Sequence, residues 1–142
     1  IFMPTLLDEL KTKLSIYQRV LDLLRQMLNL TTQKEKLELE IKAREIARKY
    51  GIDEAAFIAT IRCESGFNPR ATNQNKDGTI DYGIVQLNSY WYIGQDKEIK
   101  TPQEALNNPE KCLDLMARMF KAGRATDWIC YRSGKYISFL RN

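Results

Sequence analysis

A seven-residue repeat of apolar side chains occupies the first part of the chain, and it restricts that segment to a long helix. The apolar residues between Leu7 and Leu28 follow one another at alternating spacings of three and four. They are Leu7, Leu10, Leu14, Tyr17, Leu21, Leu24 and Leu28. This is the a/d pattern of a coiled coil, and the opposite face carries charged residues. The sequence therefore predicts one amphipathic helix over residues 1–31.

The sequence is compatible with three different partners for this helix. Further apolar residues widen the stripe, namely Ile16, Val20, Leu23 and Met27. Such a helix packs either on its own domain or, through residues 4–28, on another copy of the chain as a coiled coil or stalk. A helix lying on a membrane surface is the third alternative. No apolar run approaches the roughly 18–20 residues that a membrane-spanning helix needs.

The repeat stops at residues 29–32, where we place the start of a second domain over residues 32–142. Thr32 and Glu35 have the spacing of a capping box, in which two side chains satisfy the free amides of a helix start. We expect a new helix to begin there and to end before Gly51, since glycine suits the left-handed position after a helix. Its apolar stripe is Leu39, Ala43, Ile46, Ala47 and Tyr50.

The remaining residues predict short helices around a small hairpin. Residues 68–83 are rich in turn formers, and Asp77-Gly78 is a strong signal for a two-residue turn between antiparallel strands. Further helices are expected over residues 53–64, from Pro102, over 109–122 and from Thr126-Asp127 onward. The fold class is therefore α+β, mostly α, with a small antiparallel hairpin or sheet.

The composition excludes several kinds of catalysis. The chain has no histidine, so Ser-His-Asp and Cys-His mechanisms lack their imidazole base. With only three cysteines, a Cys/His zinc site is not expected, and we predict no metal or cofactor. The net charge is +4, but the basic residues are scattered and not interleaved with aromatics, so we predict no nucleic-acid partner. Carboxylates are the natural acid and base of any enzyme built from this chain.

The first residues do not resemble a signal peptide. They have no basic start and no small-residue cleavage site, and the chain begins at Ile1 rather than at methionine. We expect that an upstream export signal or membrane anchor has been removed. The alternative is that Met3 is the natural first residue.

Glu64 and Asp81 are the candidate pair of carboxylates. Glu64 lies at the end of a predicted apolar helix, and Asp81 lies 17 residues later on the far arm of the predicted hairpin. A glycosidase needs one protonated carboxyl to donate to the leaving oxygen and one ionised carboxylate opposite it. Burial would keep Glu64 protonated, while polar neighbours favour an ionised Asp81. The spacing alone is common between unrelated surface residues.

The residues around this pair make the argument specific. The stretch from Glu64 to Ser89 resembles the active-site segment of animal (c-type) lysozymes, and it aligns without a gap. It runs from the catalytic Glu through the Asp77-Gly78 turn to Asp81-Tyr82-Gly83, and on to Gln86-Leu87-Asn88-Ser89. The resemblance covers about residues 50–135. It implies a lysozyme-like fold, peptidoglycan glycan strands as substrate and an extracytoplasmic, secreted or envelope-associated location.

The resemblance also implies roles for individual residues. Glu64 becomes the general acid/base, and Asp81 the nucleophile or the stabiliser of the positive charge at the anomeric carbon. Trp128 matches the tryptophan that shields the catalytic Glu. The expected sugar-binding residues are Asn73, Asn75, Gln86, Asn88, Trp91, Tyr92 and Trp128.

Two other functions stay open. Residues 64–69 (Glu-Ser-Gly-Phe-Asn-Pro) and 106–110 also resemble bacterial and phage lytic transglycosylases. Those enzymes use a single Glu, form a 1,6-anhydro product without water and typically lack a carboxylate at the position of Asp81. The presence of Asp81 therefore favours hydrolysis. A non-catalytic, lysozyme-shaped glycan-binding module is the alternative from another class.

The cysteines predict one disulfide. Cys63 immediately precedes Glu64, and Cys130 follows Trp128 by two residues. If Trp128 shields Glu64 as the resemblance implies, the two sulfurs are neighbours, and an exported protein would allow them to bond. We expect Cys112 to be a lone buried thiol, because it has apolar neighbours on its helix.

Overall fold

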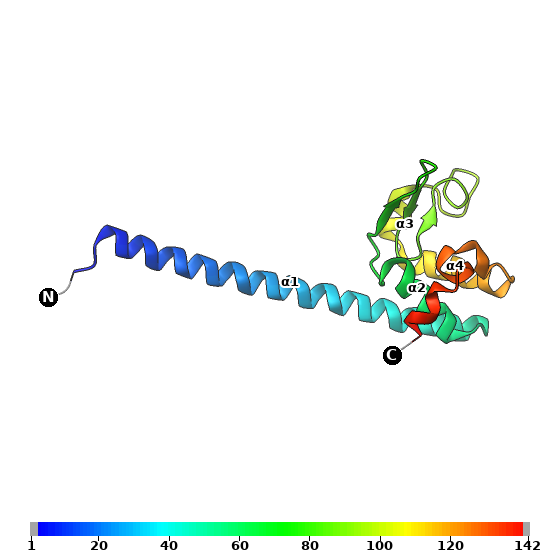
Figure 1. Ribbon diagram of the computed structural model, residues 1–142, viewed down its shortest axis with the longest axis horizontal. Coiled ribbons are helices and arrows are strands. Elements are labelled where there is room, and N and C mark those ends of the chain that lie inside the picture. Colours follow the sequence, from blue (N-terminus) through cyan, green and yellow to red (C-terminus); the bar gives the residue numbers. More distant parts are fainter. Residues whose placement is uncertain (1–2, 141–142) are drawn as a thin grey trace. The chain divides into compact units, whose positions relative to one another are not determined.

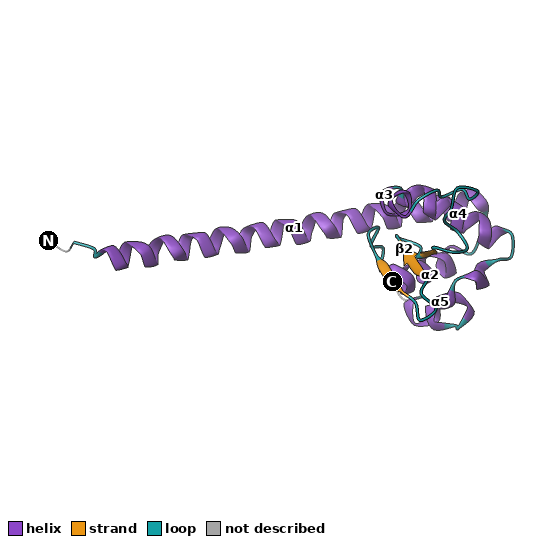
Figure 2. Ribbon diagram, turned by 90° about the horizontal axis from the view of Figure 1, so that it is seen from above, coloured by secondary structure: helices purple, strands orange, loops and turns teal. Residues whose placement is uncertain are grey.

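The computed structural model describes residues 3–140, and these residues form a mostly helical α+β structure with one small sheet (Figure 1, Figure 2). The elements in chain order are α1 (Leu6–Tyr50), α2 (Glu54–Ser65), β1 (Thr72–Gln74), β2 (Ile80–Tyr82), β3 (Leu87–Asn88), α3 (Pro102–Asn107), α4 (Pro109–Lys121), η1 (Ala125–Asp127), α5 (Ile129–Arg132) and η2 (Lys135–Phe139). The chain divides between Glu35 and Lys36 into two compact units, which we call the N-terminal and C-terminal units. None of the helices within residues 3–140 has the length and apolarity needed to cross a bilayer.

The predicted helix break at residues 29–32 is wrong, because α1 is continuous. The hydroxyls of Thr31 and Thr32 donate to main-chain carbonyls four residues back, at 2.9 and 3.0 Å, so both threonines are accommodated inside the helix. The capping box lies instead at Thr5 and Asp8. The Asp8 amide donates to Thr5 Oγ1 at 3.2 Å, and the Thr5 amide donates to Asp8 Oδ2 at 3.1 Å.

The C-terminal unit has a single hydrophobic core, to which α1, α2 and α4 contribute. The predicted stripe of α1 is confirmed, because Leu39, Ala43, Ile46 and Ala47 are buried. Phe57 and Ile61 of α2 pack in the same core and are fully buried. Phe57 also packs edge to face on Phe120 of α4, with ring centroids 5.3 Å apart. The core thus fixes the position of the last turn of α2, which carries Glu64.

The predicted hairpin is confirmed and gains a third strand. The order is β1-β2-β3, all antiparallel, with Asp81 opposite Asn73 on one side and opposite Asn88 on the other. Gly78 has a φ of 87°, as the tight turn requires. Gly83 follows β2 with a φ of 82°, and a Cβ there would lie 2.6 Å from the carbonyl oxygen of Ala105 in α3. Glycine therefore lets the sheet pack closely on α3.

The last predicted helix is shorter than expected. The chain after Gly123 forms the 3-10 helix η1, one turn of α-helix in α5 and the 3-10 helix η2. Trp128 lies between η1 and α5 with an extended backbone, which ends the helix that was expected to run on from Thr126. This interruption brings both the Trp128 ring and the amide of Cys130 to the side of the unit that contains Glu64.

Candidate active site

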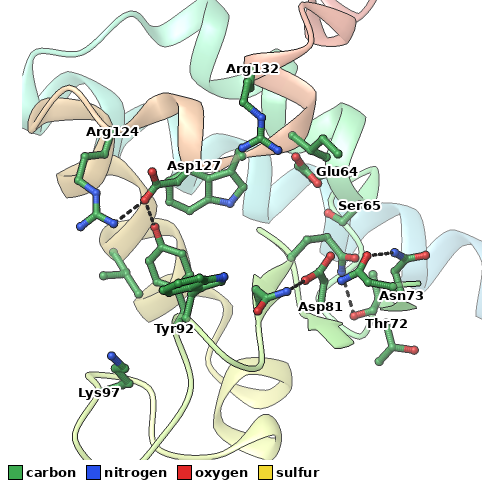
Figure 3. A pocket seen from close by; sticks show the side chains of 18 of the residues that line it. Glu64, Ser65, Thr72, Asn73, Asp81, Tyr92, Lys97, Arg124, Asp127 and Arg132 are labelled. Carbon is green, nitrogen blue, oxygen red and sulfur yellow. Dashed lines mark hydrogen bonds and ion pairs between the residues drawn. The ribbon is translucent and has the colours of Figure 1, made fainter. Parts of the chain in front are cut away.

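A groove of about 1410 Å³ crosses the C-terminal unit, and all nine residues singled out in the sequence line it. Its walls come from the end of α2, the sheet, the loop after β3 and the segment from η1 to α5 (Figure 3). Its volume exceeds the roughly 300–1,000 Å³ of a typical small-molecule pocket. The groove is therefore large enough for an extended ligand such as an oligosaccharide.

Glu64 and its neighbour Ser65 are each hydrogen-bonded to a distant part of the chain. The amide of Cys130 donates to Glu64 Oε1 at 3.0 Å. The neighbouring Ser65 hydroxyl donates to the carbonyl of Ile84 at 2.5 Å, which ties the end of α2 to the chain after β2. The bond from Cys130 fixes the direction of the Glu64 carboxyl, and the Ser65 bond fixes the end of α2 that carries it.

The surroundings of Glu64 favour its protonated form. Burial raises the pKa of its carboxyl, and the negative charge of Asp81 raises it further. The hydrogen bond from the Cys130 amide and the positive charges of Lys135 and Arg132 oppose this shift, but they do not cancel it. In Figure 3, Arg132 and Asp81 lie on opposite sides of Glu64. Glu64 is therefore suited to donate a proton at higher pH than an ordinary glutamic acid.

Asp81 occupies the central strand of the sheet and has a polar environment. The side-chain amide of Asn88 donates to Asp81 Oδ1 at 2.9 Å and to Thr79 Oγ1 at the same distance. Asn73 lies opposite Asp81 on the other neighbouring strand. The carboxyls of Glu64 and Asp81 thus line the same groove, but they come from different elements and have different hydrogen-bond partners.

Asn73 and Asn75 belong to a chain of hydrogen bonds that orders the hairpin. Asn73 Nδ2 donates to Asn75 Oδ1 at 3.2 Å, and Asn75 Nδ2 donates to Thr79 Oγ1 at 3.1 Å. The Thr79 hydroxyl donates in turn to Asp77 Oδ1 at 2.7 Å. Thr79 therefore links the turn residues to Asn88, the partner of Asp81, and so helps to position Asp81.

Gln86 lines the groove, but its side chain is hydrogen-bonded to main-chain carbonyls. Its side chain is almost fully buried, and Nε2 donates to the carbonyls of Ala71 and Gly83 at 3.1 and 2.9 Å. Its φ of 54° lies in the left-handed region, which non-glycine residues rarely adopt. These bonds hold the loop between β2 and β3 in a conformation that keeps Asp81 and Asn88 on one sheet.

The two aromatic residues predicted to bind sugar together behave differently. Tyr92 packs on Trp128, with ring centroids 5.6 Å apart, and its hydroxyl donates to Asp127 Oδ2 at 2.5 Å. Burial raises the pKa of the Tyr92 hydroxyl, as does its bond to Asp127. Trp91 is 68% exposed and contacts Tyr90 edge to face. The Tyr92 ring is thus held in the groove wall by its partners, whereas the Trp91 ring is mostly exposed to solvent.

Trp128 lies inside the groove wall and is nearly fully buried. Its indole N–H donates to the carbonyl of Val85 at 2.7 Å, and its ring also packs on Phe120 at 5.9 Å between centroids. Two residues later the Cys130 amide bonds to Glu64. This short segment therefore brings an indole ring and a hydrogen-bond donor to the same part of the groove.

The Cys63–Cys130 disulfide is confirmed, with 6.1 Å between the two Cα atoms. It joins the residue before Glu64 to the residue that donates to Glu64. Cys112 is a free buried cysteine, as expected, and its Sγ donates weakly to the carbonyl of Ala105 at 3.4 Å. Burial raises the pKa of the Cys112 thiol to about 12. Cys112 is thus a packing residue and not a nucleophile.

Eight further charged residues line the groove and were not predicted as site residues: Lys76, Asp77, Asp96, Lys97, Glu98, Arg124, Asp127 and Arg132. Asp127 accepts from both Tyr92 and Arg124, the latter at 2.6 Å. Its only signal in the sequence is its position next to Trp128, because its partners come from elsewhere in the chain. No group of three or more acidic or cysteine side chains within residues 3–140 is arranged to hold a metal ion.

Comparison with known proteins finds one matching family and several similar proteins. The family model of the transglycosylase SLT domain matches residues 42–125. Lysozyme C of Crax fasciolata is 39% identical over 56 residues, which are 35% of this chain and 43% of that protein. Lysozyme C-1 of Anas platyrhynchos is 49% identical over 41 residues, 29% of this chain and 28% of that protein. Lysozyme C of Takifugu rubripes is 40% identical over 57 residues, 40% of each chain.

The chain spans less than half the length of these curated relatives. The family match, in contrast, covers more than half of the chain and includes Glu64, the whole sheet and α4. The chain therefore belongs to the transglycosylase SLT domain family, within the lysozyme-like superfamily.

Proposed function

We propose that the protein is a peptidoglycan hydrolase, a muramidase that cleaves the β-1,4 bond between N-acetylmuramic acid and N-acetylglucosamine. Glu64 is the general acid/base, and Asp81 is the nucleophile or the stabiliser of the oxocarbenium ion. The observation that carries this proposal is the pair of carboxyls in one groove, with the pKa of Glu64 raised by burial and Asp81 bonded to the side-chain amide of Asn88. Glycosidases need this division of roles.

The reaction follows from the two environments. Glu64 donates its proton to the glycosidic oxygen as the bond to the anomeric carbon breaks. Asp81, on the central strand, meets the positive charge that grows on that carbon. Ionised Glu64 then takes a proton from the incoming water, which completes hydrolysis and returns the carboxyl to its acid form.

The remaining groove residues support binding of a glycan strand. Trp91 offers an exposed ring on which a sugar can stack, and the rigid pair Tyr92 and Trp128 forms the wall beside it. The amides of Asn73 and Asn88 line the sheet side, where hydroxyl and N-acetyl groups need hydrogen-bond partners. A disulfide beside Glu64 suits an extracytoplasmic enzyme, since disulfides persist in oxidising compartments.

A lytic transglycosylase is the second candidate, and the match to the SLT family model favours it. In that chemistry Glu64 acts alone, and the muramic acid itself closes the 1,6-anhydro ring. Asp81 then has no chemical step. Its position on the central strand, bonded to Asn88, is the reason that we place hydrolysis first.

Mass spectrometry of digested peptidoglycan separates the two reactions. Hydrolysis leaves reducing muramic acid ends, whereas transglycosylation leaves anhydro ends that are lighter by one water. We expect reducing ends. Anhydro ends alone would replace the hydrolase proposal with the transglycosylase. Unchanged glycan strands, together with binding that survives Glu64→Gln, would leave a glycan-binding module.

A further inference from the structure

The N-terminal part of α1 exposes all of its large apolar side chains. From Leu6 to Leu30 their exposed fractions lie between 47% and 73%. They are Leu6, Leu7, Leu10, Leu14, Ile16, Tyr17, Val20, Leu21, Leu23, Leu24, Met27, Leu28 and Leu30. The largest apolar patch on a typical monomer is only about 300–600 Å². A surface of this kind needs a partner.

These side chains form two stripes on one helix. The first seam is Leu7, Leu10, Leu14, Tyr17, Leu21, Leu24 and Leu28. The second seam is Ile16, Val20, Leu23, Met27 and Leu30, with the same alternation of four and three. The second seam equals the first one shifted by one residue, and consecutive residues of a helix point about 100° apart. The helix thus carries two parallel heptad seams about 100° from each other.

The repeat identifies the kind of partner. A strict seven-residue repeat drifts by about 20° per heptad on a straight helix, and it stays in contact only with another helix that supercoils around it. A flat surface or a membrane imposes no such period. Two seams of the same type therefore indicate that each helix contacts two neighbouring helices.

The angle and the area decide how many helices take part. A two-stranded coiled coil covers one seam and leaves the other in water. Seams about 100° apart are close to the corner angle of about 90° in a four-helix bundle. Thirteen half-exposed side chains present on the order of 1,000 Å² of apolar surface per helix, comparable with the ~800 Å² per partner of a stable interface.

We propose that residues 6–30 assemble into a closed bundle of at least three copies of this chain, with four copies fitting the seam angle best. The first seam of each copy packs on the second seam of the next, and this head-to-tail contact closes into a ring. The charged side chains stay on the outside, where Asp22 and Arg25 form a helical pair at 3.1 Å. The assembly is independent of the proposed enzymatic activity.

The mass of the full chain in solution tests this proposal. Sedimentation equilibrium over a wide concentration range should give at least three times the chain mass of 16.5 kDa. Leu24→Lys places a charge in the first seam, and Leu23→Lys places the same charge in the second seam one residue earlier. Both variants should lower the mass, whereas Gln26→Lys on the polar face should leave it unchanged. Near-UV circular dichroism, to which both tryptophans of the C-terminal unit contribute, checks that this unit stays folded.

Three results would overturn the proposal. A monomer at all concentrations would show that no second copy covers the helix. A dimer that responds to Leu24→Lys but not to Leu23→Lys would show an ordinary two-stranded coiled coil. A monomer that co-sediments with vesicles of phosphatidylglycerol and phosphatidylcholine, and loses this binding in both variants, would show a membrane-surface helix instead.

Discussion

The two walls of the groove hold their carboxyls in opposite ways. The helical wall buries Glu64, joins the residue before it to Cys130 by a disulfide and gives it a single main-chain donor. The sheet wall leaves Asp81 among amides and hydroxyls, with Asn88 as its direct partner. One wall raises the pKa of its carboxyl, and the other gives its carboxyl a side-chain amide as partner. The difference teaches that the fold gives two carboxyl side chains unlike surroundings, and the roles that we propose for them rest on this contrast.

Glu64→Gln should have the largest effect, because it removes the carboxyl that we propose as the proton donor. The amide still fits the cavity and still accepts from the Cys130 amide. General acid catalysis contributes about 100- to 10,000-fold, so we expect a loss of this size in the release of muropeptides from purified cell wall. Glu110→Gln, on the surface of α4 and outside the groove, is the matched control. Equal activity of both variants would remove Glu64 from the mechanism.

Asp81→Asn tests the sheet wall and separates the two reactions. The new side chain still accepts from Asn88 through its oxygen, but its charge is lost. For a hydrolase we expect a fall of about 100-fold or more in rate, since charge stabilisation of the transition state has that size. A loss below about tenfold would favour a transglycosylase that uses Glu64 alone.

For the same variant, Asp81→Asn, we expect the pH dependence of the residual activity to shift. The charge of Asp81 raises the pKa of Glu64, so its removal lowers that pKa. Because the proposed mechanism requires a protonated Glu64, the alkaline limb of the pH–rate profile should move to lower pH in Asp81→Asn. A limb that stays in place would mean that the two carboxyls do not interact.

Replacing both cysteines of the disulfide tests how far the helical wall depends on its covalent link. Cys63→Ser combined with Cys130→Ser opens a loop of 67 residues. We expect the free energy of unfolding to fall by about 2–4 kcal/mol, measured in denaturant. Activity should fall more than stability explains, because the Cys130 amide positions Glu64. Full activity in the folded double variant would show that the link serves stability alone.

Tyr92→Phe should give the smallest effect, because it removes one hydrogen bond and keeps the ring contact with Trp128. Asp127 retains Arg124 as a partner. We expect a loss of about 1 kcal/mol in unfolding free energy and a change of a few-fold in KM, with kcat nearly unchanged. A collapse of kcat would instead give the Tyr92 hydroxyl a part in the chemistry.

The sequence predicted the features that depend on local chemistry. The Asp77-Gly78 turn, the core stripe of α1 and the end of α2 beside Glu64 follow from residues a few positions apart. The gap-free resemblance from Glu64 to Ser89 supplied the candidate pair and, through Trp128, the disulfide. These predictions needed no knowledge of how distant segments meet.

Long-range packing and helix context explain what the sequence did not predict. The Ser65 bond to the Ile84 carbonyl and the Asp127 bond to Tyr92 join segments 19 and 35 residues apart. The break at residues 29–32 was predicted from polar residues that prefer turns. Within α1, Thr31 and Thr32 satisfy their hydroxyls on the helix's own carbonyls, so the preference is overcome.

A titration of Glu64 by carboxyl carbon NMR tests the central claim most directly, because that claim is a neutral acid on the helical wall. The account predicts that the pKa of Glu64 lies above its ordinary value of 4.5, and that it falls toward that value in Asp81→Asn. A pKa at or below 4.5 in the unmodified protein would contradict the account, since Glu64 would then be ionised where the enzyme must donate a proton.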